Sequence, residues 1–375
     1  MHQIVVLGSG FAALTAIRTL RKEGWKEKII LISPRSHLTY YPSLIWVPAG
    51  LRNEKDLTVS LEKFFQKYDV FHHKANVTGL SAKKQHVYTD AGTIAFDKLI
   101  VGTGGRFIKK LPGIEHAFIP CESFEATNSY SQRLAVLNNG TLAFGFSSNP
   151  KEPAAMRGGP IFEFLFGIDT LLRKQGRRQD FELVFFSPAA EPGKRLGDSA
   201  VTALLHEMDK RSIQTHLGHK LSEFKVDGVI TEGGEFHSDL TLFMPGMTGP
   251  AWLANSDLPL SEGGFIQADE HCRIPGIENI FVAGDSGSYP GPGWLPKQAH
   301  IADLQAIAAV KNLLADIQGL PADYKFKPEL ICIVDAYSNG MLIYRDPERN
   351  VLLPKSILFH WSKRFFEWWY LRGYR

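Results

Sequence analysis

The sequence predicts an α/β protein with two Rossmann-like domains, each built on a doubly wound parallel sheet, and a C-terminal amphipathic helix. Two strand–helix–strand patterns, one at the N-terminus and one from about residue 139, predict the two sheets. A late strand ending in Gly284-Asp285, followed by a long helix, indicates that the first domain resumes after the second. We therefore expect residues 1–112 and 245–320 to form the first domain, 113–244 the second and 321–375 a C-terminal region.

The apolar pattern gives the individual elements. Short continuous apolar runs predict buried strands, and longer runs with a helical period predict helices. A chain of 375 residues also exceeds what one hydrophobic core usually serves, which favours two packed domains. The expected strands lie at 3–7, 29–32, 97–101, 141–146, 182–187 and 279–283, and the expected helices at 12–23, 161–174 and 297–314.

Composition excludes several classes of protein. Apolar residues make up 44% and charged residues 22%, with 42 Lys+Arg against 39 Asp+Glu, so neither disorder nor a nucleic-acid-binding excess of positive charge is indicated. The three cysteines are too few for a disulfide framework and, with the histidines, too scattered for a metal site. The chain enters its first strand at once and lacks a long apolar run, so we expect a cytoplasmic protein without a leader or a membrane-spanning helix.

The turn Gly8-Ser-Gly10-Phe-Ala-Ala13 closes the first strand and opens the first helix. Gly8 permits the tight turn, Gly10 lets backbone amides approach a pyrophosphate, and Ala13 is small enough for close packing of helix on strand. The acidic residue that would hold an adenine ribose is missing, because the second strand ends in Ser33-Pro-Arg35. Arg35 could meet a phosphate instead, so this turn alone leaves FAD and NADP open.

The late Gly284-Asp285 favours FAD. In the two-dinucleotide flavoproteins, which this order of elements resembles, such a carboxylate lies against the ribityl chain of FAD. The loop Val101-Gly-Thr103-Gly104-Gly105 supplies a third element in the expected order. These residues together predict an FAD site.

The second strand–helix–strand unit lacks the matching glycine turn. It has Phe144-Gly-Phe-Ser-Ser-Asn-Pro-Lys151, and Ser187 stands where a ribose-binding acid would be expected. A pyrophosphate has no cradle in such a loop. We infer that electrons come from a donor other than NAD(P)H, while an unusual nicotinamide site stays open.

Residues 355–375 combine aromatic bulk with five Lys and Arg residues. On a helix, Trp, Phe and Leu side chains gather on one face, with Lys363 and Glu367 away from it. This composition is typical of a helix that lies in a membrane interface. A helix docked on the protein itself or on a second copy is the alternative.

The chain resembles the sulfide:quinone oxidoreductases over nearly its whole length. The resemblance rests on Tyr41-Pro-Ser-Leu-Ile-Trp-Val-Pro-Ala-Gly50, on Pro296-Lys297 and on Phe366-Glu-Trp-Trp-Tyr-Leu-Arg372. It implies that Phe366, with Trp369, contacts a quinone and that Lys297 lies beside the flavin, where a cation would stabilise the reduced ring. It also implies a role for Cys332 as one of two redox cysteines, and Cys121 matches a third cysteine of many bacterial members.

The sequence departs from this family at several positions. Met156-Arg157-Gly158 stands where the second redox cysteine is expected, and Glu125 and Arg195 replace two histidines. Cys121 and Cys332 could act as a changed pair, Cys332 could act alone, or both could be structural; Cys272 is expected to be structural.

The resemblance implies an FAD-dependent oxidoreductase that passes two electrons from a small sulfur donor, sulfide, to a quinone. The enzyme would lie peripherally on the inner face of the cell membrane, and a homo-oligomer is left open. Two alternatives remain, a type II NADH:quinone dehydrogenase-like enzyme and a degenerate flavoprotein with a binding role.

Overall fold

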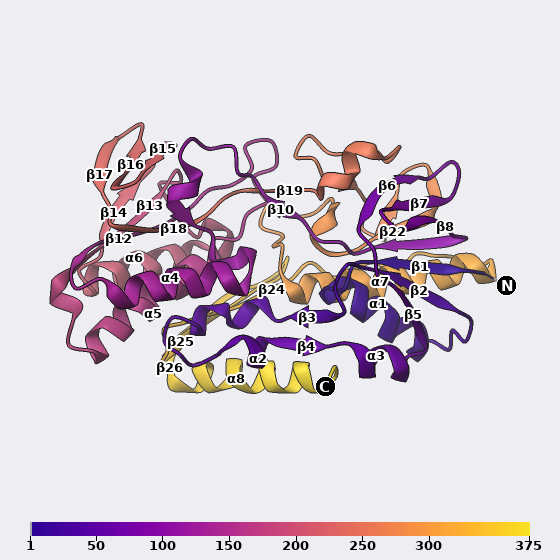
Figure 1. The fold of residues 1–375 in the computed structure, drawn as a ribbon, viewed down its shortest axis with the longest axis horizontal. Helices are drawn as coiled ribbons and strands as arrows, with labels where there is room; N and C mark the ends of the chain where they lie inside the picture. Colours follow the sequence, from indigo (N-terminus) through magenta and orange to yellow (C-terminus); the bar gives the residue numbers. More distant parts are fainter. Residues whose placement is uncertain (1) are drawn as a thin grey trace.

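The computed structural model of the protein describes residues 2–375 (Figure 1). Its first sheet has six strands, which come from the N-terminal segment and from the late segment that was expected to rejoin it. Strands β5, β2, β1, β9 and β22 are parallel neighbours, and β21 adds to the edge antiparallel to β22. Helices α1 and α7 pack on one face, and β6–β8 cover the other. The bounds are β1 Ile4–Leu7, α1 Phe11–Lys22, β2 Ile29–Ile32, β5 Val70–His73, β6 Val77–Ser81, β7 His86–Thr89, β8 Gly92–Ala95, β9 Lys98–Val101, β21 Arg273–Ile274, β22 Ile277–Val282 and α7 Ala299–Gln318.

The two faces of β1 explain these layers. Ile4 and Val6 belong to the core shared with α1 and α7, whereas Val5 and Leu7 belong to the core under β6–β8. Successive side chains of a strand point to opposite faces, so a strand buried on both sides must be apolar throughout. This requirement is why β1 reads as an uninterrupted apolar run.

The second sheet repeats this arrangement. Its strands β11, β18, β12, β13 and β14 are all parallel, helices α4, α5 and α6 pack on one face, and β15–β17 cover the other. The bounds are β11 Ala117–Phe118, α4 Phe124–Val136, β12 Gly140–Phe146, α5 Gly159–Lys174, β13 Phe181–Ser187, α6 Asp198–Lys210, β14 Gln214–Leu217, β15 Leu221–Lys225, β16 Gly228–Thr231, β17 Gly234–His237 and β18 Leu240–Met244.

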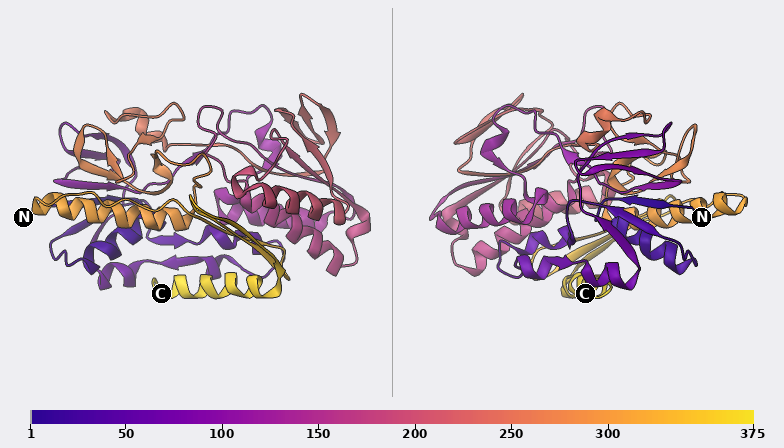
Figure 2. Two further views of the ribbon diagram at one scale, coloured as in Figure 1. Left: turned by 180° about the vertical axis from the view of Figure 1, so that it is seen from behind. Right: turned by 45° about the vertical axis from the view of Figure 1, so that its right-hand side comes forward.

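The C-terminal region is an antiparallel sheet followed by a helix, and the sheet was not predicted from the sequence. Strands β24 (Leu330–Asp335), β25 (Gly340–Arg345) and β26 (Asn350–Ser356) pack on the second-domain core, while the end of α8 (Ile357–Arg372) packs on the first-domain core. Figure 2 shows these strands running between the two domains and α8 lying along one edge of the molecule. The region therefore ties the two domains together.

Smaller elements complete the chain. These are β3 His37–Thr39, α2 Glu54–Leu57, β4 Thr58–Ser60, α3 Glu62–Lys67, β10 Arg106–Phe107, β19 Met247–Thr248, β20 Ile266–Gln267 and β23 Gly287–Ser288. Within residues 2–375, no helix combines the length and the apolar character needed to cross a bilayer.

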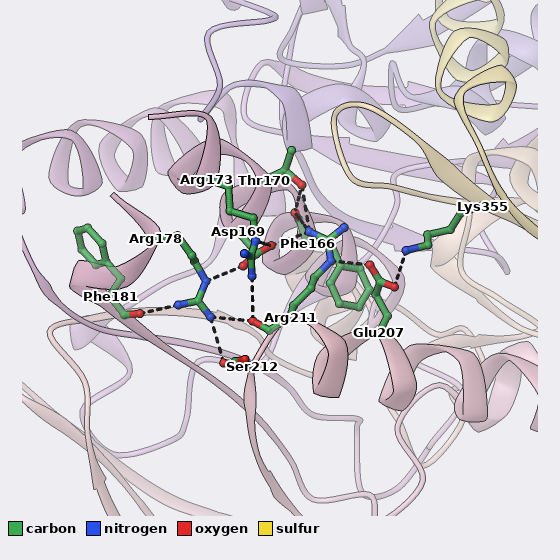
Figure 3. Close-up of polar contacts among 10 residues, drawn as sticks. All are labelled: Phe166, Asp169, Thr170, Arg173, Arg178, Phe181, Glu207, Arg211, Ser212 and Lys355. Atoms are coloured by element: carbon green, nitrogen blue, oxygen red, sulfur yellow. Dashed lines mark hydrogen bonds and ion pairs between the residues drawn. The ribbon is translucent and has the colours of Figure 1, made fainter. Parts of the chain in front are cut away.

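A buried ion network anchors the second domain (Figure 3). Asp169 of α5 is fully buried and accepts from Arg173 at 2.9 Å, Arg178 at 2.6 Å and Arg211 at 2.7 Å. Burial alone would raise the pKa of Asp169, but the three guanidinium groups outweigh burial and hold that pKa below its ordinary value. Glu207 of α6 pairs with Lys355 of β26 at 2.6 Å, which fixes the C-terminal sheet to this domain.

The predicted fold class is confirmed by these two parallel sheets and by helix α8. The last long helix begins at Ala299, so the expected start at 297 was wrong by two residues. Gln298 is extended, with φ −127° and ψ 155°. Lys297 is therefore outside the helix, and its Nζ donates to the carbonyl of Gly287 at 2.9 Å.

Candidate active site

The predicted dinucleotide turn has the geometry that its sequence indicates. Gly8 has φ +102°, and a Cβ there would lie 2.4 Å from the carbonyl oxygen of Gly102. A Cβ on Gly102 would in turn lie 3.0 Å from the backbone nitrogen of Ala13. The loop after β9 can therefore approach helix α1 this closely only because residue 102 is a glycine. No heavy atom lies within 4 Å of the position that a Cβ on Gly10 would take. The N-terminus of α1 is therefore open to a phosphate group.

The three predicted loops meet at one place. Thr103 Oγ1 lies 3.2 Å from Ser286 Oγ, which also donates to the carbonyl of Gly104 at 3.0 Å. A Cβ on Gly284 (φ +73°) would lie 3.1 Å from the Cβ of Ala12. The carboxyl ends of neighbouring parallel strands meet at the same sheet edge, which is where doubly wound folds bind ligands. These residues can hold FAD.

Ser33 and Arg35 follow the neighbouring strand β2. Ser33 is buried, and its hydroxyl donates to the carbonyl of Arg35 at 2.7 Å and accepts from the Arg35 amide at 3.1 Å. This bonding shapes the loop and leaves the Arg35 side chain exposed. The Arg35 side chain is therefore accessible to a phosphate group, and that contact stays a prediction.

Asp285 and Lys297 lie at one cavity of about 100 Å³. Lys297 Nζ also lies 3.9 Å from the ring centroid of Phe265. Burial lowers the pKa of Lys297, and the negative charge of Asp285 opposes this effect. A cation held here can stabilise negative charge that develops on a bound ring.

Arg157, which the sequence showed only as a departure from a family pattern, forms an ion pair with Asp285. Burial would lower the pKa of Arg157, but Asp285 outweighs it and the pKa is raised. The positive charge of Arg157 also acts on Cys121. The charge of Arg157 thus acts both on Asp285 and on one of the two candidate cysteines.

Cys121 and Cys332 both pack in the apolar cluster around α5. Cys121 lies in the short 3-10 helix Pro120–Glu122 and is buried, whereas Cys332 on β24 is half-buried. The Cys332 Sγ lies 3.8 Å from the position of a Cβ on Gly159, which places it against the first turn of α5. Burial raises the pKa of each thiol to about 12, so both are protonated thiols near neutral pH.

The other residues singled out from the sequence lie apart from this cluster. Cys272 is fully buried in the first-domain core. Glu125 is exposed in the first turn of α4. Arg195 is half-buried and donates to the carbonyls of Ala154 and Leu295, two residues that line the same cavity as Lys297.

A buried polar group between α5 and α8 was missed from the sequence. Glu163 forms an ion pair with Lys363 and accepts from the Asp335 amide at 2.9 Å. Burial raises the pKa of Glu163 to about 7, although Lys363 opposes this effect. Asp335 in turn accepts from His360 at 2.7 Å and from the Trp46 indole at 3.2 Å. The one acid in the apolar run Ile161–Phe166 was the available signal for Glu163.

Helix α8 presents its aromatic face outward. Ile357, Leu358, Trp361, Phe365, Phe366, Trp368 and Trp369 are exposed. His360, Glu367, Tyr370 and Leu371 are buried against the protein, and Glu367 pairs with Arg52 at 2.7 Å. The buried face of α8 therefore lies against the protein, and the exposed aromatic face is left without a partner within residues 2–375. Phe366 stacks near Trp369, with ring centroids 5.8 Å apart.

Comparison with known proteins agrees with the two-sheet fold. Residues 2–306 match the family model described as pyridine nucleotide-disulphide oxidoreductase. The chain is 24% identical to the sulfide-quinone reductase of Aquifex aeolicus, covering 98% of this chain and 90% of that protein. It is 23% identical to the type II NADH:quinone oxidoreductase of Staphylococcus saprophyticus, covering 91% and 90%.

Two solved structures show the same fold. The sulfide:quinone oxidoreductase of Aquifex aeolicus superposes with a TM-score of 0.92 at 23% identity, over 100% of this chain and 92% of that one. The NDH2 of Plasmodium falciparum gives a TM-score of 0.73 at 11% identity, over 100% and 95%. At these identities the superpositions establish the fold and not the reaction.

Proposed function

Because the chain belongs to the pyridine nucleotide-disulphide oxidoreductase family, which confirms the predicted FAD-dependent oxidoreductase class, we propose that it passes two electrons from sulfide to a quinone. The quinone is reduced at the exposed aromatic face of α8. The observation that carries the proposal is the Glu163–Lys363 pair, which joins α8 to α5. The amide of Asp335 donates to the same Glu163 carboxylate, which connects the pair to β24, the strand that bears Cys332. Similarity to the Aquifex aeolicus sulfide-quinone reductase along 98% of the chain supports it.

The polar group at α8 supplies what quinone reduction needs. A quinone takes up two protons with its two electrons, so a proton donor must reach the ring. A carboxyl whose pKa is about 7 exchanges its proton readily near neutral pH, and Lys363 adjoins it with a hydrogen-bonded ammonium group. Phe366 and Trp369 offer aromatic surface for the quinone ring on the same helix.

The donor side uses FAD and thiols. Bound FAD supplies a two-electron carrier. Two hydrosulfide ions give one hydrodisulfide ion, one proton and two electrons. The quinone takes up these two electrons with two protons, so the overall reaction consumes one further proton from solvent. Cys332 is the more accessible of the two candidate thiols for taking up sulfur. The positive charge of Arg157 opposes the effect of burial on the pKa of Cys121 and so favours its thiolate form.

The second domain argues against a nicotinamide donor. Cys332 Sγ lies against the first turn of α5, 3.8 Å from the position of a Cβ on Gly159, and a pyrophosphate would bind at this turn in a nucleotide-binding domain. The loop after β12 packs closely on the connection between β18 and β19. A Cβ on Gly246 of that connection would lie 2.4 Å from the backbone of Asn149. Asn149 is buried and donates to the carbonyls of Met247 and Gly263.

An anaerobic half-reaction experiment tests the proposal. Sulfide should bleach the flavin absorbance of the FAD-loaded protein, and a short-chain quinone should restore it. Cys332→Ser should slow bleaching strongly, whereas Cys272→Ser, a cysteine buried in the other core, should not. Bleaching by NADH and not by sulfide would overturn the proposal in favour of an NADH:quinone oxidoreductase. Absence of bleaching by either donor would favour a binding role.

The exposed face of α8 fits a membrane surface, and we propose that this helix lies in the interface without spanning it. Tryptophan and arginine side chains favour the headgroup zone, and Trp368 lies under the guanidinium of Arg372 at 5.6 Å. A quinone dissolved in the bilayer would then meet Phe366 directly.

A further inference from the structure

A second cavity, of about 630 Å³, opens beside the candidate active site. It lies where the loop after β13, the segment that carries Trp294 and the end of β25 meet. Its lining includes Lys194, Arg195, Asp198, Trp294, Arg345 and Asn350. We call it the basic cavity, because three of these six side chains are cationic and one is acidic.

The charges of the basic cavity are only partly balanced by the protein, although Arg345 and Lys194 both act on Asp198. Lys194 is paired with Asp198 at 2.7 Å and with Glu191 at 3.1 Å, so its charge is compensated. Arg195 and Arg345 have no carboxylate partner among residues 2–375. Arg195 donates only to backbone carbonyls, and its buried Nε has no hydrogen-bond partner within the described chain. Arg345 donates to the carbonyl of Arg195 at 2.9 Å.

An unpaired cation that is removed from water costs free energy, which an anion in the cavity would recover. Burial lowers the pKa of Arg195 to about 10, which reflects this cost but leaves the group charged at neutral pH. Guanidinium groups match the planar fork of a carboxylate or the edge of a tetrahedral oxyanion. The charge of this cavity therefore selects for anions.

The walls indicate an organic ligand. Trp294 stacks under Arg345, with the guanidinium 5.1 Å from the ring centroid, which holds that group at the cavity wall. A Cβ on Gly197 would lie 2.0 Å from Asn350 Nδ2, so glycine is needed for Asn350 to reach its place. A volume of about 630 Å³ is that of a small-molecule site and exceeds what one inorganic ion fills.

We propose that the basic cavity binds a small organic anion, which presents a carboxylate or sulfonate group to Arg195 and Arg345. The inference stands apart from the proposed sulfide and quinone reaction. Arg195 separates this cavity from the one that holds Asp285 and Lys297, because its donor groups end on Ala154 and Leu295 of the inner cavity wall. An anion bound here therefore lies one side chain away from the FAD-side cavity.

Titration calorimetry of the full-length, FAD-loaded protein tests this proposal with succinate, with sulfate and with the uncharged analogue succinamide. Succinate should bind saturably, sulfate more weakly, and succinamide at least about tenfold more weakly than succinate. Arg345→Gln should weaken succinate binding about tenfold or more. Arg349→Gln removes the same charge four residues away, outside the cavity, and should leave the affinity unchanged.

Three results would overturn the proposal. The first is no saturable binding of succinate, even at succinate concentrations well above millimolar. The second is succinamide binding as tight as that of succinate, and the third is an unchanged succinate affinity in the folded Arg345→Gln protein. The flavin-to-protein ratio and the melting temperature report whether the variant is folded. If it is not, the succinate and succinamide titrations of the unaltered protein still decide. None of these readouts requires turnover, so an inactive enzyme would not affect the result.

Discussion

Replacing Glu163 with glutamine tests whether this buried carboxyl delivers protons to a quinone at α8. The folded protein raises the pKa of Glu163 from 4.5 to about 7. This change corresponds to about 3 kcal/mol in favour of the protonated form, relative to a free glutamate. About 90% of Glu163 is then protonated at pH 6 and about 10% at pH 8.

A step that requires protonated Glu163 should therefore slow about tenfold between pH 6 and pH 8. The assay is stopped-flow reoxidation of pre-reduced flavin by excess short-chain quinone at several pH values. Glu163→Gln keeps the shape of the side chain but cannot donate a carboxyl proton. We expect reoxidation in this variant to be about a hundredfold slower and independent of pH in this range.

Glu207→Gln provides a matched control, because Glu207 is also a buried glutamate paired with a lysine of the C-terminal region. It lies outside the Glu163–Asp335 group, so the pH dependence should persist in this variant. A flat profile in the unaltered protein, or a Glu163→Gln protein that keeps the break near pH 7, would refute the proton-delivery role.

Three further predictions concern stability, FAD and the membrane. Asp169→Asn should destabilise the second domain by about 3 kcal/mol, seen as a lower melting temperature, because it leaves buried arginines short of a partner. Since the folded protein lowers the pKa of Asp169, the stabilisation from its carboxylate is present above the ordinary carboxyl pKa and is lost as pH falls through the lowered value. The Asp169→Asn variant should therefore lose less stability on acidification than the unaltered protein does. An equal loss in both proteins would count against the network. Gly8→Ala should purify with little FAD, measured as the flavin-to-protein ratio, because its Cβ would collide with Gly102; full occupancy would contradict the predicted cradle. Trp361→Glu with Trp368→Glu should abolish co-sedimentation with anionic vesicles, and unchanged binding would place the membrane contact elsewhere.

Local chemistry made the first strand and the glycine turns at its sheet edge predictable from the sequence. A strand buried on both faces must be a continuous apolar run, and a turn that approaches other backbone must carry glycine, so β1, Gly8 and Gly284 could be identified without tertiary information. The two parallel sheets and the outward aromatic face of α8 were predictable for the same reason. The apolar periodicity of a strand or a helix can be read from residues that are close together in the sequence.

The sequence could not determine the contacts between segments that are far apart along the chain. Glu163 and Lys363 are 200 residues apart, and the Arg157 pair with Asp285 spans 128. The residues that flank these charges in sequence give no indication of the partner. The antiparallel sheet β24–β26 was also missed, because its exposed strand β26 lacks a clear alternation of apolar and polar residues.

The sequence by itself therefore determined the class of fold, the glycine turns at the edge of the first sheet and the amphipathic C-terminal helix, because each depends on the spacing of neighbouring residues. Only the tertiary structure decided how charges are compensated. It paired Arg157 with Asp285 and Glu163 with Lys363, and it left Arg195 and Arg345 at a cavity without an ion pair to any carboxylate of residues 2–375. Burial and charge compensation depend on which segments meet in space, and folding brings those segments together from across the chain.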